Sequence, residues 1–344
     1  MHAITTAELL RALSLRDLTD PAAGPHAMQL LLDQIHAALP APVHVHRASP
    51  IVSIADNYDH LGYPPDGAAR DARYTRYVCD TALLRTQTSA MIPPLLRTLE
   101  PPDDIVLSCP GLVYRRDVID RIHVGEPHQV DLWRIANKRL GEAELEAMIA
   151  AVVGAALPGV RWRTEPASHP YTTHGRQIDV DVGEWIEIGE CGLAAPTMLR
   201  SDQTGLAMGL GLDRLLMLRK GIDDIRLLRA SDPRIASQML DLAPYRPVSM
   251  MPPVRRDLSI VAEPSPEQLG DRVRAALGAR ADLLESVEIL SVTPYEQLPA
   301  AAIARLGIAP GQHNVLVRLT LRALDRTLTH QECNVLRDEV ANAL

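Results

Sequence analysis

The sequence of 344 residues contains no phenylalanine, although a chain of this length ordinarily carries on the order of ten. It has 3 tryptophans and 8 tyrosines, so the absence concerns one amino acid and not aromatic rings in general. Lysine is nearly absent as well, because only Lys138 and Lys220 stand among the 35 basic residues. A GC-rich genome explains this preference for arginine more simply than function does, although arginine also binds carboxylate and phosphate in a planar, bidentate way.

Cysteine is scarce and dispersed. The 4 cysteines form no Cys-x-x-Cys pair, which argues against a zinc knuckle and against a disulfide framework. A reducing compartment is therefore expected, with the cytoplasm as the default. No apolar run reaches the length of a membrane span, and the opening residues MHAITTAELLRALSLRDLTD lack an apolar core flanked by basic residues. We therefore expect neither a membrane anchor nor a signal peptide.

Composition and charge place the chain among folded globular proteins. Hydrophobic residues make up 47% and charged residues 23%, which excludes global disorder and allows a sizeable core. The length suggests two domains. The net charge of −8 argues against a surface coated for bulk nucleic-acid binding.

The pattern of apolar residues divides the chain into parts of different character. Residues 1–45 contain short helices broken by proline, and apolar spacing predicts a helix over His26–Leu39. Residues 46–242 alternate strands with helices. The clearest are strands over 105–107, 177–182 and 185–188, a helix over 142–156, and a glycine-rich strand that runs into a helix over 206–218. Residues 243–253, which contain PYRPVSMMPP, are predicted to be a linker.

The C-terminal part, residues 254–344, has the order β-α-β-β-α. Strands are predicted over 254–262, 287–292 and 314–324, with a helix over 265–277. Thr329 and Glu332 have the spacing of a capping box, which predicts the start of a last helix. This order is ferredoxin-like, with a further edge strand expected, and the fold class expected for the chain is α+β.

The most informative stretch is Gly111–Asp131, GLVYRRDVIDRIHVGEPHQVD, in which a strand ends in two arginines and a loop leads to a second strand. An arginine such as Arg115 can pair with phosphate oxygens and stabilise charge at a transferring phosphorus. Gln129 and Asp131 are two residues apart in a strand, so they share a face and could grip an ammonium group. For any single arginine, an ordinary surface ion pair is the competing explanation.

A second stretch, Thr204–Arg214, reads TGLAMGLGLDR and is rich in glycine. Gly209 and Gly211 would let the backbone approach a flat ligand, and Arg214 follows at the start of a helix. By itself this passage is weak evidence, because glycine also permits close packing of strands.

Together these stretches resemble class II aminoacyl-tRNA synthetases, specifically the catalytic subunit of phenylalanyl-tRNA synthetase. YRRDVIDRIHVGEPHQVD resembles motif 2 of that family, and GLGLDRL resembles its motif 3. The C-terminal PPVRRDLSIV and DRTLTHQE resemble the family's ferredoxin-fold anticodon-binding domain. Matching segments in the right order are far more specific than any single one, and they cover roughly residues 45–344. The other matches are ARD (69–71), RTQTS (85–89), WIE followed by CG (185–192), and GIDDIR (221–226).

The resemblance implies a domain order and a reaction. Residues 1–45 would be a helical extension, 46–242 a catalytic domain with an antiparallel sheet flanked by helices, 243–253 a linker, and 254–344 the anticodon-binding domain. This is the layout of the single-chain, organellar-type enzyme. The implied ligase uses ATP and Mg²⁺ to form an aminoacyl adenylate and passes the amino acid to tRNA, with no covalent enzyme intermediate. It would act without a membrane, as a monomer or a homodimer.

Carried over by position, the resemblance also implies roles for single residues. Arg115 and Arg214 would be catalytic, the first at the α-phosphate and the substrate carboxylate, the second at the γ-phosphate. Glu187 would help to bind magnesium. The ATP-binding set is Arg115, Asp117, His123, Gly209, Gly211 and Arg214. The amino-acid-binding set is Gln87, Ser89, Gln129, Asp131, His169, Tyr171 and Ala207. The candidate tRNA-binding set is Arg255, Arg256, Arg318, Arg322 and Arg326, for which solvated surface charge is the competing explanation.

The sequence departs from the family mainly in the amino-acid pocket. The histidine of the family's RTHTS is Gln87 here, and the glutamate of its VEG is the shorter Asp131. The family's FPF becomes His169-Pro-Tyr171, whereas the small residue of its FAF is kept as Ala207. The pocket should therefore keep its length and gain an imidazole and a hydroxyl, which need partners if they are buried.

Two explanations compete for the missing phenylalanine. Either the pocket has changed substrate, toward a more polar amino acid, or phenylalanine was removed from the whole chain. The expected substrate is accordingly an amino acid that is aromatic or a more polar analogue. The second is favoured by sites far from the pocket, such as VRLTLR at 317–322 where the family has FRLTFR. A protein made while charged tRNA for phenylalanine codons is scarce would need such a composition.

Three functions remain open at this stage. The first is a tRNA ligase, with tRNA for phenylalanine codons as the expected acceptor. The second is an adenylating enzyme that delivers the amino acid to an acceptor other than tRNA. The third is a catalytically altered paralogue that binds tRNA as a regulator.

Overall fold

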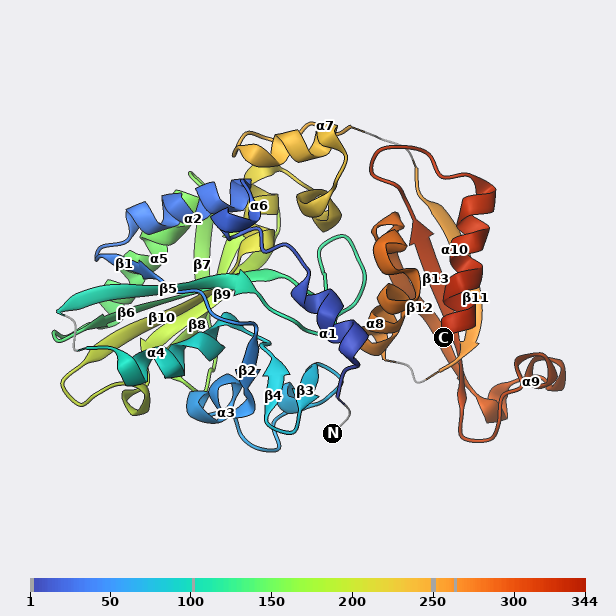
Figure 1. Ribbon diagram of the computed structural model, residues 1–344, viewed down its shortest axis with the longest axis horizontal. Helices are drawn as coiled ribbons and strands as arrows, with labels where there is room; N and C mark the ends of the chain where they lie inside the picture. The colour runs from blue at the N-terminus through green and yellow to red at the C-terminus, as the bar shows by residue number, and fades with distance from the viewer. Residues whose placement is uncertain (1–2, 101–102, 249–251, 263–264) are drawn as a thin grey trace. The chain divides into compact units, whose positions relative to one another are not determined.

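The computed structural model describes residues 3–100, 103–248, 252–262 and 265–344 (Figure 1). Contacts divide the chain into two units. The first comprises Met1–Arg115, Glu126–Ile222 and Met239–Tyr245, and the second comprises Arg116–Gly125, Asp223–Gln238 and Arg246–Leu344. The domain boundaries expected from the sequence remain a proposal, and residues 249–251 of the expected linker lie outside the described residues.

A seven-stranded sheet forms the centre of the first unit. Its strand order is β1-β5-β6-β10-β9-β8-β7, and all neighbours are antiparallel except the parallel pair β1 and β5. The expected antiparallel sheet and the α+β fold class are confirmed. The strands are β1 (Val43–Val45), β5 (Asp104–Leu112), β6 (His128–Ala136), β7 (Arg161–Pro166), β8 (Thr172–Asp181), β9 (Trp185–Ala194) and β10 (Thr204–Gly211).

Helices cover both faces of this sheet, with α2 and α4 on opposite sides (Figure 1). Helix α5 (Glu142–Ala156) has the bounds that the sequence predicts. Its acidic first turn suits the positive end of the helix dipole, and Gly141 N–H donates to Glu144 Oε2 at 2.8 Å. The apolar residues of α5 recur at helical spacing and are buried: Leu145, Met148, Ile149, Val152, Val153 and Ala156.

The remaining elements of the first unit are short. A small sheet of order β2-β4-β3 carries Arg85 at its end. The strands are β2 (Ile51–Ser53), β3 (Tyr77–Cys79) and β4 (Ala82–Leu84). The α-helices are α1 (Thr6–Leu13), α2 (Ala27–Ala38), α3 (Ile54–Asn57), α4 (Ile92–Thr98) and α6 (Leu212–Lys220). The 3₁₀ turns are η1 (Pro21–Ala23), η2 (Asp59–Leu61), η3 (Ala68–Arg70), η4 (Thr88–Met91) and η5 (Pro196–Met198).

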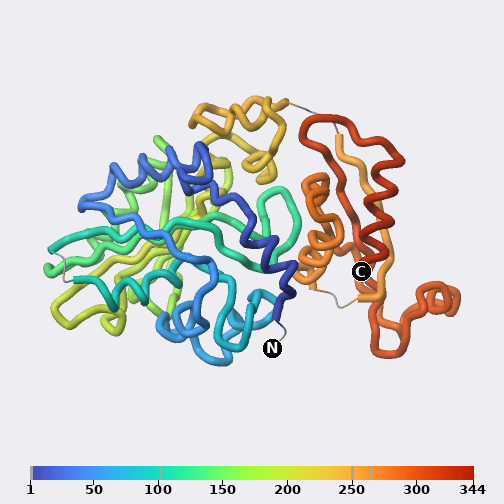
Figure 2. The backbone as a smooth tube through the Cα atoms, in the orientation of Figure 1, coloured from blue at the N-terminus to red at the C-terminus, as the bar shows by residue number. Residues whose placement is uncertain are grey.

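The second unit contains the expected β-α-β-β-α elements in that order, with one further helix, α9, between its last two strands, and the path of the chain can be followed in Figure 2. Its antiparallel sheet has the order β11-β13-β12, and its core includes Leu258, Val273, Val317 and Leu336. Thr329 and Glu332 do form the capping box of the last helix. The elements are η6 (Ile225–Arg229), α7 (Pro233–Ala236), η7 (Ser237–Leu240, which ends in the first unit), β11 (Val254–Val261), α8 (Pro266–Leu277), η8 (Gly278–Leu283), β12 (Leu284–Pro294), η9 (Tyr295–Gln297), α9 (Ala300–Leu306), β13 (His313–Leu321) and α10 (His330–Ala343).

Two features of the second unit differ from the prediction. Helix α9, between β12 and β13, was not predicted, because its alanine-rich sequence has little amphipathic pattern. The expected further edge strand is not among the described residues, where this sheet has three strands. Within the described ranges, no helix is both long and apolar enough to cross a membrane.

Candidate active site

Register places the site residues on one face of the large sheet. Gly209 on β10 lies opposite Asp131 on β6 and opposite Glu190 on β9, and Ala207 lies opposite Trp133. Directly opposed residues of antiparallel strands point to the same face. The glycines at alternate positions of β10 therefore form a floor without side chains between the functional groups of its two neighbours.

Asp131 is an enclosed acid of this face, with 3% of its surface exposed. Thr88 Oγ1 donates to its Oδ2 at 2.8 Å, Ser89 Oγ donates at 2.9 and 3.0 Å, and Trp133 Nε1 donates to Oδ1 at 3.2 Å. Burial raises the pKa of Asp131, and these hydrogen bonds and the nearby His169 offset part of the rise. The predicted pair Ser89 and Asp131 is thus in direct contact.

Aromatic rings make a wall beside Asp131. Tyr171 stacks on Trp133 with ring centroids 5.9 Å apart and lies 6.4 Å from the ring of Tyr63. Burial is the main cause that raises the pKa of Tyr171 well above its usual value, and the charge of Asp131 adds to it. Ala207 is buried in the same cluster as Trp133. Ala207 is thus packed beside an indole that the sequence did not mark as a site residue.

Two predicted pocket residues have protein partners. Tyr63 donates its hydroxyl to Gln87 Oε1 at 2.9 Å, and Gln87 Nε2 donates to the carbonyl of Asn57 at 3.1 Å. His169 Nε2 lies 2.8 Å from Glu190 Oε2, and its Nδ1 lies 3.1 Å from Thr172 Oγ1. Gln87 is thus held by hydrogen bonds on both sides, whereas His169 Nε2 lies close to the Glu190 carboxylate without hydrogen-bonding geometry.

Charged groups gather toward the Gly211 end of β10. A β-bulge at Ile188 places one extra residue in β9, so Glu187 and Glu190 both point to the site face although they are three residues apart. Arg214 Nη1 donates to the carbonyl of Glu187 at 2.9 Å. Burial and the charge of Glu190 raise the pKa of Glu187, while Arg214 and Arg115 act in the opposite direction. Arg214 is thus in contact with Glu187, and Arg115 is close enough to lower the pKa of Glu187.

The carboxylates of Glu187 and Glu190 could bind magnesium only together with ligands that the described residues do not supply. Within the described part of the chain, no group of three or more His, Cys, Asp and Glu side chains could hold a metal ion by itself. Magnesium in nucleotide sites takes one or two carboxylates and completes its shell with phosphate oxygens and water. Glu187, with its raised pKa beside a second carboxylate, fits that partial role.

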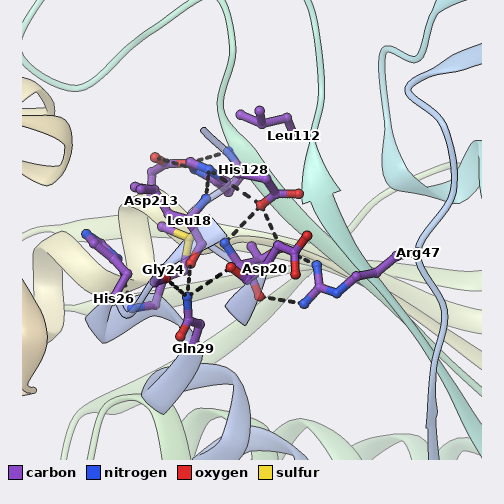
Figure 3. Close-up of polar contacts among 12 residues, drawn as sticks. Leu18, Asp20, Gly24, His26, Gln29, Arg47, Leu112, His128 and Asp213 are labelled. Carbon is purple, nitrogen blue, oxygen red and sulfur yellow. Dashed lines mark hydrogen bonds and ion pairs between the residues drawn. The ribbon is translucent and has the colours of Figure 1, made fainter. Parts of the chain in front are cut away.

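Behind the sheet, a buried network fixes the starts of β6 and α6 (Figure 3). His128 is fully buried, and its Nδ1 lies 3.1 Å from Asp213 Oδ1, while its backbone N–H also donates to Asp213. Leu18 N–H donates to His128 Nε2 at 3.0 Å. Since Nε2 accepts, the ring proton of the neutral imidazole sits on Nδ1 and faces Asp213. Gln129 and Arg214 directly follow these two residues, so the network positions both.

Arg85 links the end of the small sheet to the end of β5. It is 3% exposed, its Nε donates to the carbonyl of Leu112 at 2.7 Å, and one Nη1 hydrogen bond reaches the carbonyl of Ala48 at 3.2 Å. A Cβ atom at Gly111 would lie 2.3 Å from Arg85 Nη2, so glycine is required for this close approach.

Comparison with known proteins decides the family. A family model described as "tRNA synthetases class II core domain (F)" matches residues 16–239, well over half of the chain. The chain belongs to the class II aminoacyl-tRNA synthetase family. This result confirms the resemblance that motifs 2 and 3 indicate.

The chain is also similar in sequence to curated proteins of this family. The chain is 36% identical over 189 residues to the phenylalanine–tRNA ligase alpha subunit of Prochlorococcus marinus, which covers 53% of this chain and 56% of that protein. It is 37% identical over 193 residues to the corresponding subunit of Synechocystis, with the same coverage. The chain thus spans about half the length of the curated relatives that it matches.

The fold is also similar to solved structures. Two pyrrolysyl-tRNA synthetase structures from Desulfitobacterium hafniense are 17% identical, with TM-scores of 0.45 and 0.47. The first alignment covers 66% of this chain and 78% of that chain. The second covers 69% of this chain and 81% of that chain.

Other residues that the class II resemblance implies lie in the second unit. Asp120 holds His123, whose Nδ1 lies 2.8 Å from Asp120 Oδ2. The carbonyl of Asp117 accepts from Arg274 Nη1 at 2.8 Å. The ATP-binding roles of Asp117 and His123 stay predictions.

The five arginines predicted to bind tRNA divide into two groups. Alternation places Arg255, Arg318 and Arg322 on the sheet face opposite the buried residues of β13. Arg318 makes a bidentate pair with Asp257 at 2.8 Å. Arg256 and Arg326 instead contact α10: Arg256 Nε donates to Asn334, and Arg326 pairs with Glu332 at 2.8 Å. The tRNA-binding role of these residues stays a prediction.

Several residues that shape this class II site were not predicted from the sequence. Glu190 was missed because only the bulge at Ile188 turns it to the face of Glu187. Trp133 carried a signal, since it is two residues after Asp131 in the same strand and must share its face. His128 precedes Gln129 in β6 and points to the other face, which the alternation of side chains could have predicted, whereas Asp213 lies in helix α6 and no alternation indicates its contact with His128.

Proposed function

We propose that the chain is an ATP-dependent aminoacyl-tRNA ligase similar to phenylalanine–tRNA ligase, which forms an aminoacyl adenylate and transfers the amino acid to tRNA. The support comes from the class II family assignment and from relatives named as phenylalanine–tRNA ligase alpha subunits. The acceptor proposed is the tRNA that reads phenylalanine codons. The ferredoxin-like part, proposed to span 254–344, would bind its anticodon, with the protein acting as a monomer or a homodimer.

The observation that carries this proposal is the polarity of one sheet face. A buried acid, Asp131, stands at one end of the glycine floor, and Arg115 and Arg214 stand with Glu187 toward the other. An amino acid has an ammonium group and a carboxylate separated by one carbon, and its reaction partner is a polyphosphate. A surface that offers an acid at one end and arginines at the other suits both reactants at once.

Each group then has a defined task. Asp131, Ser89 and Gln129 hold the α-ammonium group, so the substrate carboxylate points toward the arginines. The carboxylate oxygen attacks the α-phosphorus of ATP, the bond to the β-phosphate oxygen breaks, and pyrophosphate leaves. Arg115 and Arg214 stabilise the charge that develops on the phosphates. Magnesium, bound by ATP and Glu187, would neutralise the same phosphate charge. A terminal tRNA hydroxyl then takes the acyl group and releases AMP.

One observation favours a second candidate, a paralogue that binds tRNA as a regulator. The carboxylate of Asp131 already accepts hydrogen bonds from Thr88, Ser89 and Trp133. A substrate ammonium group has to share or displace these donors. In a regulator this pocket would stay closed and tRNA binding would remain.

The test is ATP–pyrophosphate exchange with each of the twenty amino acids, followed by aminoacylation of unfractionated tRNA. Exchange with one or a few amino acids and acylation of tRNA are expected. Arg115→Ala should lower the exchange rate by about 100-fold or more, whereas Arg139→Ala, at an exposed position, should leave it unchanged. An adenylate without tRNA acylation would indicate another acceptor. No exchange with any amino acid, together with intact tRNA binding, would establish the regulator instead.

A further inference from the structure

Two carboxylates flank Gly209 on the site face. Gly209 pairs with Asp131 on one neighbouring strand and with Glu190 on the other, so the three residues stand in one row across β6, β10 and β9. Glycine contributes no side chain, and the nearest atom to a Cβ built there is Asp131 Oδ2, at 3.8 Å. A ligand above Gly209 would therefore meet a carboxylate on either side.

The carboxylates of Asp131 and Glu190 differ in how many further hydrogen bonds they can accept. Asp131 is enclosed and accepts from three side chains. The side chain of Glu190 is 46% exposed, and its Oε2 lies 2.8 Å from His169 Nε2. An ionised carboxylate can accept about four hydrogen bonds. Glu190 therefore keeps acceptor capacity, and its contact with His169, which also lies beside Thr172 and the ring of Tyr171, keeps the carboxylate near the aromatic wall.

The charges of Asp131 and Glu190 both act on the pKa values of Tyr63 and Tyr171, the two phenols of the aromatic wall. Burial raises the pKa of Tyr63 to about 12, and the charges of Asp131 and Glu190 add to the effect. The same two charges act on Tyr171, after burial, in the same direction. The negative potential thus extends over the aromatic wall and is not confined to the acids. Such a pocket favours a cationic or hydrogen-bond-donating group over a hydrocarbon.

We propose that Glu190, positioned by His169, determines specificity, and that the pocket takes an amino acid whose side chain ends in a hydrogen-bond donor. This inference rests on the proposed function, because it assigns the α-ammonium group to Asp131 and leaves Glu190 for the variable side chain. The donor is an amine, an amide or a hydroxyl. Glu190 accepts it directly, and the substrate ring or chain lies against Tyr171.

A hydrocarbon side chain is disfavoured at this site for a physical reason. Binding a phenyl ring over Gly209 would remove water from Glu190 without giving it a new hydrogen-bond donor, and desolvating a carboxylate without such compensation costs free energy. Sites built to hydrogen-bond a substrate group reject analogues that lack it far more strongly than apolar pockets reject small differences in size. The missing donor, rather than the size of the side chain, would then exclude phenylalanine.

The experiment uses the full chain and two readouts. ATP–pyrophosphate exchange measures kcat/KM for lysine, arginine, histidine, glutamine, serine and tyrosine against phenylalanine, leucine and methionine. Isothermal titration measures binding of the same amino acids without ATP. The variants are Glu190→Gln, which removes the charge at constant size, and His169→Gln, which removes its positioning partner. Glu184→Gln, in the exposed turn between β8 and β9, is the matched control.

A donor-bearing amino acid should be preferred, and E190Q should lower its kcat/KM about tenfold or more, as expected for the loss of a hydrogen bond to a charged group. Phenylalanine should gain or stay level in E190Q, and E184Q should behave as the native chain. Preference for phenylalanine, unchanged in E190Q, would overturn the inference and leave the ligase proposal standing. Binding of donor-bearing amino acids without exchange would support the inference and overturn the ligase proposal. Binding of no amino acid would overturn the inference.

Discussion

Nδ1 of His128 lies 3.1 Å from Oδ1 of Asp213, on the face of the sheet opposite the candidate site. His128 starts β6 directly before Gln129, and Asp213 stands in the first turn of α6 directly before Arg214. One buried contact thus joins the strand that would bind the ammonium group to the helix that would carry the phosphate-binding arginine. Leu18, from the N-terminal residues, closes the network through its N–H group.

Asp213→Asn tests this network. The backbone N–H of His128 would lose a charged acceptor, and the amide NH₂ would face a ring that already donates from Nδ1. The free energy of unfolding should fall by about 2 kcal/mol, as for a buried hydrogen bond to a charged group. Urea denaturation followed by circular dichroism measures it. Asp202→Asn, on an exposed turn, should leave the stability unchanged. An equal, small effect in both variants would show that the contact contributes nothing.

The pH dependence of stability should carry a signature of Asp131. Burial raises its pKa in the folded state, so above the ordinary pKa of about 3.9 the folded chain binds more protons than the unfolded chain. Its contribution to the free energy of unfolding therefore falls as the pH rises through that window. In urea titrations, the difference in stability between the native chain and Asp131→Asn should decrease from about pH 4 toward neutral pH. A constant or increasing difference would contradict the buried, desolvated acid.

Much of this fold could be predicted because local signals and tertiary packing agree. Helix α5 has an acidic start and a regular apolar stripe, and the structure gives it the predicted bounds. Strand β5 was predicted too short because Cys109 and Pro110 interrupt the apolar run, although both lie within the pairing with β6. Pairing with β6 therefore extends β5 through residues whose own strand propensity is low, because the neighbouring strand supplies hydrogen bonds.

Site residues could be predicted where their side-chain direction follows from alternation within one strand. They could not be predicted where their position depends on how separate strands pair. Asp131 and Gln129 follow from their spacing in one strand. Glu190 does not, because its orientation depends on a bulge and its neighbour Asp131 is reached across Gly209, on a strand far away in the sequence. Side-chain partners such as Tyr63 for Gln87 are likewise invisible before the chain is folded.

Two glycines of adjacent strands should respond differently to alanine. At Gly209 a Cβ has 3.8 Å to its nearest atom, an ordinary contact, so Gly209→Ala should keep the melting temperature while its methyl group covers the floor between Asp131 and Glu190. At Gly189 a Cβ would lie 2.2 Å from the carbonyl of Gly209, so Gly189→Ala should unfold at lower temperature. Differential scanning calorimetry and amino-acid titration separate the two effects. If Gly209→Ala bound amino acids as well as the native chain, Gly209 would not be part of the amino-acid site.

The bidentate pair of Arg318 with Asp257 makes a prediction about tRNA. If the open sheet face of the second unit binds the phosphate backbone, Asp257 competes with tRNA for the arginine. Arg318→Ala should weaken binding and reduce the salt slope of log K by about one, since one phosphate contact is lost. Asp257→Asn should tighten binding. Arg337→Ala, on α10, is the control. Filter binding over a range of salt concentrations measures all three, and equal affinities throughout would place the tRNA contact elsewhere.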